Sequence, residues 1–197
     1  MKPSAFAFAS SVLTSLLLAG CAAESADADP AADPDGSDVG ETTETSEALT
    51  SSCKLSRSQI LGATAGKRRE AIERGFEWYD DHVPYSQSRS HNGYRTDCSG
   101  FVSMCWKTGT SYTTAGFISG AASSALGSYN NLQPADALVY RSGGHGHIVL
   151  FLGWNDDAHS AACVLEQAST ASDMQFRART TASLKASGFK AIRSDSL

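Results

Sequence analysis

The pattern of apolar and polar positions divides the chain into three parts. Residues 5–20 form an apolar run broken only by Ser and Thr, and residues 22–52 carry almost no large apolar side chain. From Cys53 onward, apolar residues recur with the spacing of regular secondary structure. Only this last part can bury a core, so we predict one folded domain over residues 53–197.

Helical spacing is found in the first half of this domain. A helix is predicted in the second part of residues 57–81, where charged side chains fill the faces between the apolar positions. Pro84 lacks a backbone N–H and should stop it. The apolar positions of this helix are Ile72, Phe76, Tyr79 and Val83.

A shorter helix is predicted from Cys98 to about Lys107, with Asp97 or a neighbour as its cap. The polar residues 86–96 before it predict a loop. Residues 108–131 are rich in Gly, Ser, Thr, Ala and Asn, and one further helix is expected there, near residues 115–126.

The period changes after Leu132. The run HIVLFLGW at residues 147–154 is apolar and β-branched, which predicts a buried strand. Further strands are predicted at residues 137–140, 163–166, 174–179 and 189–193, with residues 174–179 at an edge. Helices followed by antiparallel strands indicate an α+β fold, with N-terminal helices packed on a mainly antiparallel sheet.

The net charge of −5 is unevenly distributed. Residues 22–52 hold nine acidic residues and no Lys or Arg, so they should form an extended acidic tether (21–52 with Cys21). From residue 53 onward, 15 basic residues (16 less Lys2) face 12 acidic ones (21 less nine), a balance of +3. This small excess is no footprint for a nucleic acid, and we expect no such partner.

The N-terminus predicts export. Lys2 precedes an apolar run that is short for a membrane span and ends in Leu18-Ala19-Gly20-Cys21. This ending resembles a bacterial lipobox, which implies a signal peptide over residues 1–20 and a lipid on Cys21. The protein would then be anchored through its lipid to the cell envelope, at the outer membrane or the cell surface. A plain secretory signal cut nearby is the alternative.

Cys98 is the candidate nucleophile. A thiol becomes reactive when its pKa falls, and a helix N-terminus and a nearby imidazole both lower it. Cys98 stands where a helix should begin, and Gly100 would let backbone groups approach closely. A buried core cysteine is the competing interpretation of these residues alone.

Three ordered segments resemble the NlpC-like cell-wall cysteine peptidases. Tyr94-Arg95-Thr96-Asp97-Cys98-Ser99-Gly100-Phe101-Val102 resembles that family's DCSG-F/L-V signature. The segment LQPADAL at residues 132–138 resembles its LxPGD motif, and GHIVLFLG at residues 146–153 resembles its H-V-G-I-Y-x-G strand. The resemblance implies a papain-like core, with Cys98 as nucleophile, His147 as general base and peptidoglycan stem peptides as substrate.

A third residue should orient the imidazole. Glu166 and Gln167 are the two candidates, and adjacent strand residues face opposite ways. Gln167 precedes Ala-Ser as the family's polar residue often does, whereas Glu166 resembles the acidic partner of the related CHAP amidases. A carboxylate would also stabilise the imidazolium, so Glu166 is slightly favoured. Tyr85, Asp97 and Ser99 are expected to line the substrate site.

The sequence departs from the family pattern at several points. Ala135 replaces the Gly of LxPGD, Val149 replaces the small residue after His-Val, and Trp-Gly-Gly after Tyr85 is missing. These changes concern the substrate groove more than catalysis. His145 is expected in a loop, and neither it nor any other residue suggests a metal site or a cofactor.

The remaining cysteines, Cys53, Cys105 and Cys163, allow three single disulfide pairings. Cys53 with Cys163 would join the start of the domain to the sheet, leaving Cys105 as a core thiol. The expected protein is a monomeric, lipid-anchored cysteine peptidase. A CHAP-like N-acetylmuramoyl-alanine amidase and a non-catalytic wall-binding lipoprotein are the alternatives.

Overall fold

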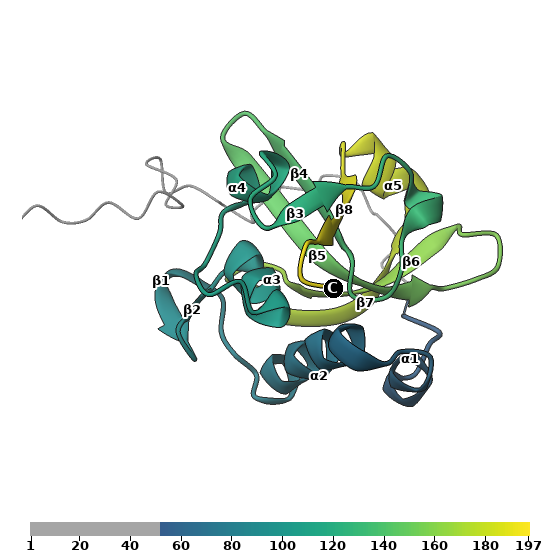
Figure 1. Cartoon of the computed structure of the whole chain (residues 1–197), viewed down its shortest axis with the longest axis horizontal. Coiled ribbons are helices and arrows are strands. Elements are labelled where there is room, and N and C mark those ends of the chain that lie inside the picture. Colours follow the sequence, from purple (N-terminus) through teal and green to yellow (C-terminus); the bar gives the residue numbers. More distant parts are fainter. Residues whose placement is uncertain (1–51) are drawn as a thin grey trace, which may run out of the picture.

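Six antiparallel strands form the central sheet, in the order β3-β8-β4-β5-β6-β7 (Figure 1). The computed structural model describes residues 52–197. Within these residues the architecture is α+β, as the sequence predicts. The strands are β3 (Ser123–Ala125), β4 (Ala137–Ser142), β5 (His145–Trp154), β6 (Ala161–Gln167), β7 (Met174–Thr180) and β8 (Lys190–Ser194).

Helices lie on both sides of this sheet (Figure 1). Helices α2 and α3 pack together and contact one side, and the short helix α5 contacts β6 and β7 from the other. A two-stranded hairpin of β1 and β2 lies beside α3. The bounds are α1 (Arg57–Gly62), α2 (Gly66–Asp80), β1 (Ser86–His91), β2 (Tyr94–Thr96), α3 (Cys98–Trp106), α4 (Thr114–Ile118) and α5 (Thr181–Ala186).

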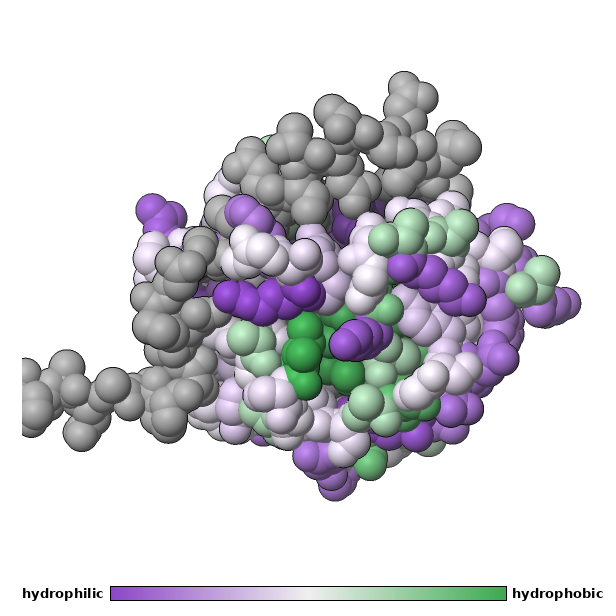
Figure 2. All heavy atoms as spheres, turned by 90° about the horizontal axis from the view of Figure 1, so that it is seen from above, coloured by the Kyte–Doolittle hydropathy of each residue, from purple (hydrophilic) through white to green (hydrophobic). Residues whose placement is uncertain are grey.

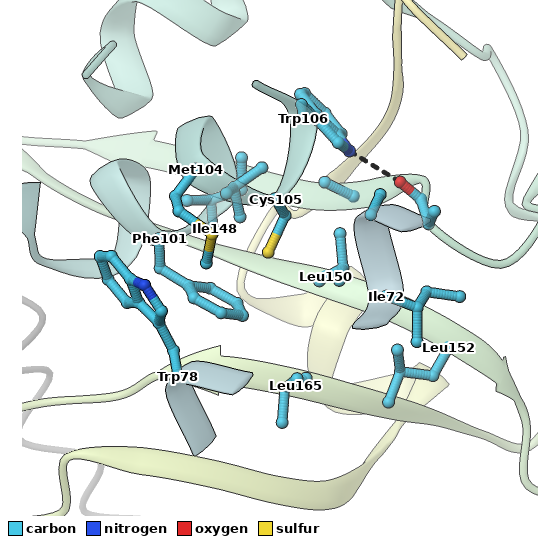
Figure 3. Packing of buried hydrophobic residues seen from close by; sticks show 14 of the residues in the cluster. Ile72, Trp78, Phe101, Met104, Cys105, Trp106, Ile148, Leu150, Leu152 and Leu165 are labelled. Atoms are coloured by element: carbon cyan, nitrogen blue, oxygen red, sulfur yellow. Dashed lines mark hydrogen bonds between the residues drawn. The ribbon is translucent and has the colours of Figure 1, made fainter. Parts of the chain in front are cut away.

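Two hydrophobic clusters, one on each face, explain the continuous apolar run of β5. Ile148, Leu150 and Leu152 belong to the cluster that includes α2 and α3 (Figure 3), and Val149 and Phe151 belong to the cluster that includes α5. Successive strand residues point to opposite faces, so a strand covered on both sides is apolar throughout. The strand predicted at residues 147–154 is confirmed and begins two residues earlier.

The first cluster fixes α3 against the sheet. Phe101 and Cys105 pack beside Ile148 and Leu150 (Figure 3), and all four are fully buried. The indole Nε1 of Trp106 donates to the carbonyl oxygen of Ala135 at 2.8 Å. The end of α3 is thereby held to the chain just before β4.

Ala135 takes a conformation that favours glycine. Its φ is +74°, in the left-handed region where a Cβ is unfavourable. The neighbouring Asp136 is fully buried and forms ion pairs with Arg68 and Arg193. The backbone strain at Ala135 is therefore held in place by its surroundings.

Two predictions about the loops were wrong. Residues 86–96 form the β1–β2 hairpin rather than a loop, with an irregular register between Ser86 and Ser90. The helix expected near residues 115–126 ends at Ile118, because Gly120 and Ala122 both adopt positive φ and β3 then pairs with β8. In the first case a polar segment forms strands by pairing with itself, and in the second a segment predicted to be helical pairs with β8, which is distant in the sequence. Strand pairing therefore decides the structure of both segments against their local composition.

The cysteines pair as favoured from the sequence. Cys53 and Cys163 form a disulfide across 110 residues, with a Cα–Cα distance of 5.2 Å. Cys98 and Cys105 take part in no disulfide within the described residues, and both are buried. The crosslink ties the first residues of the domain to β6.

The expected signal peptide, Cys21 and the tether up to residue 51 lie outside the described residues. Between residues 52 and 197, no helix combines the length and hydrophobicity needed to cross a membrane.

Candidate active site

The first turn of α3 is built around a buried aspartate. Asp97 is the N-cap, and its Oδ1 accepts a hydrogen bond from the backbone N–H of Gly100 at 2.6 Å. Arg95 donates to the other oxygen of the same carboxylate. Cys98 is therefore the first residue of a capped helix, at the end where backbone N–H groups favour an anion.

Gly100 is required by a close backbone approach. A Cβ at this position would lie 2.0 Å from the carbonyl oxygen of Arg95, which no other residue could accommodate. The glycine of the Asp-Cys-Ser-Gly segment thus lets β2 run directly against α3. This contact sets where Cys98 lies relative to the strand before it.

Asp97 and Ser99 hold the helix start. Both are almost completely buried, and the hydroxyl of Ser99 lies 3.3 Å from Asp97 and 3.0 Å from Arg95. The side chains of Asp97 and Ser99 therefore form hydrogen bonds within the protein, although the sequence predicted that they line the substrate site. Tyr85, the third residue expected to line the site, is also buried, and its backbone N–H donates to Asp173 at 2.8 Å.

His147 is paired with Glu166. The imidazole Nε2 lies 2.6 Å from the carboxylate Oε2, and both side chains are buried. With the carboxylate ionised, Nε2 carries the proton and donates it, so the lone pair of the neutral ring is on Nδ1. Nδ1 is buried and has no hydrogen-bond partner among the described residues.

Two arginines from β7 contact the same carboxylate. Arg177 Nε donates to Oε1 at 2.6 Å, and Arg179 donates to Oε1 and Oε2 at 3.0 Å each. Burial alone would raise the pKa of Glu166. The charge of Arg179, the hydrogen bond and charge of His147 and the charge of Arg177 together hold that pKa well below its usual range.

Gln167 faces the opposite side of β6. Its Nε2 donates to the carbonyl oxygen of Val83 at 2.8 Å, joining the strand to the segment after α2. Of the two candidates left open by the sequence, Glu166 is the one that contacts the imidazole. The two arginines were not predicted, although Arg177 and Arg179 stand two apart in a strand-like segment, which places them on one face.

Cys98 and His147 are carried by two elements that pack against each other. Cys98 belongs to the cluster of α2 and α3, whereas the His147 ring lies 6.4 Å from that of Phe189 in the second cluster. Helix α3 packs against β5, which carries His147. Because Nδ1 makes no hydrogen bond within residues 52–197, the thiol–imidazole hydrogen bond is not formed in this structure.

A surface pocket is lined in part by β4, the strand that pairs with β5. Tyr140, directly opposite His147 in the β4–β5 pairing, lines a pocket of about 340 Å³ together with Ile118, Arg141 and Lys190. Figure 2 views the molecule from above and shows apolar surface set among hydrophilic side chains. His145 is in β5 rather than in a loop, two residues before His147, and is exposed.

Neither a protein-family model nor a curated protein matches the sequence. In the described part of the chain, no group of three or more His, Cys, Asp or Glu side chains could hold a metal ion.

Proposed function

We propose that this protein is a cysteine hydrolase that cleaves amide bonds in peptidoglycan, with Cys98 as nucleophile and His147 as general base. The observation that carries the proposal is the buried His147–Glu166 pair. It assigns Nε2 to the carboxylate and leaves the second nitrogen, Nδ1, as the one that can accept a proton. A solvated histidine would have no such preference between its nitrogens.

The reaction begins with proton transfer from the Cys98 thiol to Nδ1 of His147. The thiolate then attacks the carbonyl carbon of the amide, and the positive end of the α3 dipole stabilises the oxyanion. His147 returns the proton to the leaving amine, and water releases the acyl group from sulfur. The hydrogen bond that starts this sequence has to form on substrate binding, as catalytic contacts often tighten only in the complex.

The resemblance and the pocket support the proposed substrate class. NlpC-like peptidases imply peptidoglycan stem peptides, which carry free carboxylates. Arg141 and Lys190 line the pocket described above and supply positive charge for such groups, while Ile118 supplies an apolar wall. The papain-like assignment of the sheet and helices is part of the same proposal, as are export and lipid attachment at Cys21.

A second candidate is an amidase that cleaves the link between sugar and peptide. The specific observation in its favour is that the acidic Glu166, rather than Gln167, contacts His147. An acidic partner is the feature that resembles the CHAP amidases. Both candidate activities use the same thiol and imidazole and differ only in which amide bond of peptidoglycan the thiolate attacks.

Mass spectrometry of the products tests the proposal. Purified protein is incubated with peptidoglycan beside Cys98→Ala and His147→Ala. Release of stem-peptide fragments by the parent alone supports the peptidase, and release of intact stem peptides from the sugar supports the amidase. If folded parent protein releases nothing but still binds peptidoglycan, the hydrolase proposal is wrong and a wall-binding role replaces it.

A further inference from the structure

One buried carboxylate at the centre of this site is shared by three donors. Glu166 is fully buried and accepts from His147, Arg177 and Arg179. Arg179 approaches with a two-pronged contact, Nε to Oε1 and Nη2 to Oε2, each at 3.0 Å. Such a fork fixes the plane of the carboxylate, and with it the direction in which Oε2 meets the imidazole.

The strand register brings both arginines to the same side. Arg177 is opposite Val164 and Arg179 is opposite Ala162, and these two residues belong to the second cluster, on the face of β6 that carries Glu166. The arginines are only partly exposed, at 26% and 17% of their side-chain area. Water therefore screens them incompletely from the imidazole.

The balance of charge matters for His147. One carboxylate beside an imidazole favours the imidazolium, because opposite charges attract. Two guanidinium groups on that same carboxylate reverse the local balance, since two positive charges stand against one negative charge. A protonated ring would then add a third positive charge to the group.

We propose that Arg177 and Arg179 are positioning residues that set the pH at which His147 accepts a proton. This inference rests on the proposed function of His147 as a base. The arginines orient Glu166 so that it holds Nε2–H, and their positive charge opposes the attraction of that carboxylate for a protonated ring. Glu166 alone would orient the ring but would also favour its protonated form.

Other titratable groups approach His147 from the neighbouring elements. Those two residues away or less in the strand register are His145 on β5 and Tyr140 with Arg141 on β4. Lys190 on β8 is exposed, and Cys98 is carried by α3, which packs against β5. Arg177 and Arg179 donate directly to the Glu166 carboxylate, so they are the residues to change.

The test uses Arg179→Gln, which removes charge and fork together, and Arg179→Lys, which keeps the charge and loses the fork. Titration of the His147 imidazole by NMR in the whole chain gives its pKa directly, with the signal assigned by its loss in His147→Gln. We expect Arg179→Gln to raise the pKa of His147 by about one unit, because removing a nearby positive charge stabilises the imidazolium. Arg179→Lys should leave that pKa close to the parent value.

Enzyme kinetics supply the second readout. Both limbs of the pH profile of kcat/KM should move to higher pH in Arg179→Gln, whereas Arg179→Lys should lower kcat without moving them. Arg89→Gln, an exposed arginine on β1, is the matched control and should change neither. Circular dichroism establishes that each variant is folded.

The two proposals fail separately. An unchanged pKa of His147 in folded Arg179→Gln would overturn the role of the arginines whether or not the protein is a hydrolase. A raised pKa without any hydrolysis by the parent would support the electrostatic role of Arg179 and count against the proposed function. A pKa that rises equally in Arg179→Lys would also overturn the inference, because charge would then not be the cause.

Discussion

The two ends of α3 are equally buried but differ in what surrounds them. At the first turn, Asp97 and Arg95 form a charged pair beside Cys98, and the strand β5, against which α3 packs, carries His147 in contact with the Glu166 carboxylate. Near the last turn, Cys105 lies among apolar side chains (Figure 3). Exclusion of water alone therefore does not decide what a thiol can do.

The two ends of α3 differ in how unfavourable it is to ionise a buried group there. Burial raises the pKa of the Cys105 thiol far above its usual value, despite the nearby positive charge of Arg74, and this keeps it inert. Buried ion pairs such as that of Glu166 add little net stability, because their desolvation offsets their attraction. Unlike the buried Asp136, which pairs with two arginines, Glu166 also contacts an imidazole, and that contact is what suggests a chemical role there.

Replacing each thiol by alanine should give the largest difference in activity between the two ends of α3. Cys98→Ala should reduce hydrolysis by about 10⁴-fold or more, because it removes the nucleophile. Cys105→Ala should keep kcat and lower the free energy of unfolding by about 1 kcal/mol through a small cavity. Turnover and urea unfolding of both variants measure this, and equal loss of turnover in folded Cys105→Ala would remove the distinction between the two ends.

Glu166→Gln should lower kcat by about 10²- to 10⁴-fold, since a neutral amide no longer holds the imidazole in the productive tautomer. Gln167→Ala is the matched control on the opposite face of the strand. It should lose the hydrogen bond to Val83, worth about 1 kcal/mol of stability, and keep kcat. A larger kcat loss in Gln167→Ala than in Glu166→Gln would reassign the orienting residue.

Low pH should reduce the contribution of Glu166 to the stability of the folded protein. The pKa of Glu166 is lower in the folded protein than in the unfolded chain, so the folded state binds fewer protons between the two values. Stability from this group is therefore present above the unfolded pKa and is lost as pH falls through the folded one. Urea unfolding below pH ~4.3, the ordinary pKa of Glu, should show a steeper loss in the parent than in Glu166→Gln, and parallel curves would argue against it.

Removing two helix caps should give the smallest difference in activity, and the two variants control for each other because their expected losses of stability are equal. Asp97 caps α3 and Thr113 caps α4, each by accepting a hydrogen bond from the backbone three residues ahead. Alanine at either position should cost about 1 kcal/mol of stability. Only Asp97→Ala should also lower kcat/KM, because it loosens the turn that carries Cys98, and thermal unfolding with kinetics on both variants separates the two effects.

The residues that could be predicted are those whose signal is local. The apolar run of β5, the cap at Asp97 and the helix carrying Ile72, Phe76 and Tyr79 follow from spacing and turn chemistry, and the structure confirms them. Val83 lies beyond this helix, which ends at Asp80 before Pro84 is reached. The β1–β2 hairpin could not be predicted in this way, because its residues are polar and its pairing has an irregular register.

The site depends on contacts that no local pattern contains. Alternation along β6 indicates that Glu166 and Gln167 face opposite ways, but which face holds His147 depends on the pairing of β5 with β6 and on a bulge near Gly153. Arg177 and Arg179 reach Glu166 only because β7 is the next strand in the sheet. Sequence thus narrows the candidates, and strand order selects among them.

The Cys53–Cys163 crosslink has a mechanical consequence. It fastens the start of the domain to β6, three residues from Glu166. A pulling force on the chain before Cys53 would therefore pass through the sulfur atoms into the interior of the sheet, and α1 and α2 would carry none of it. With that bond reduced, the same force would first peel these helices away, starting with the one nearest the pull.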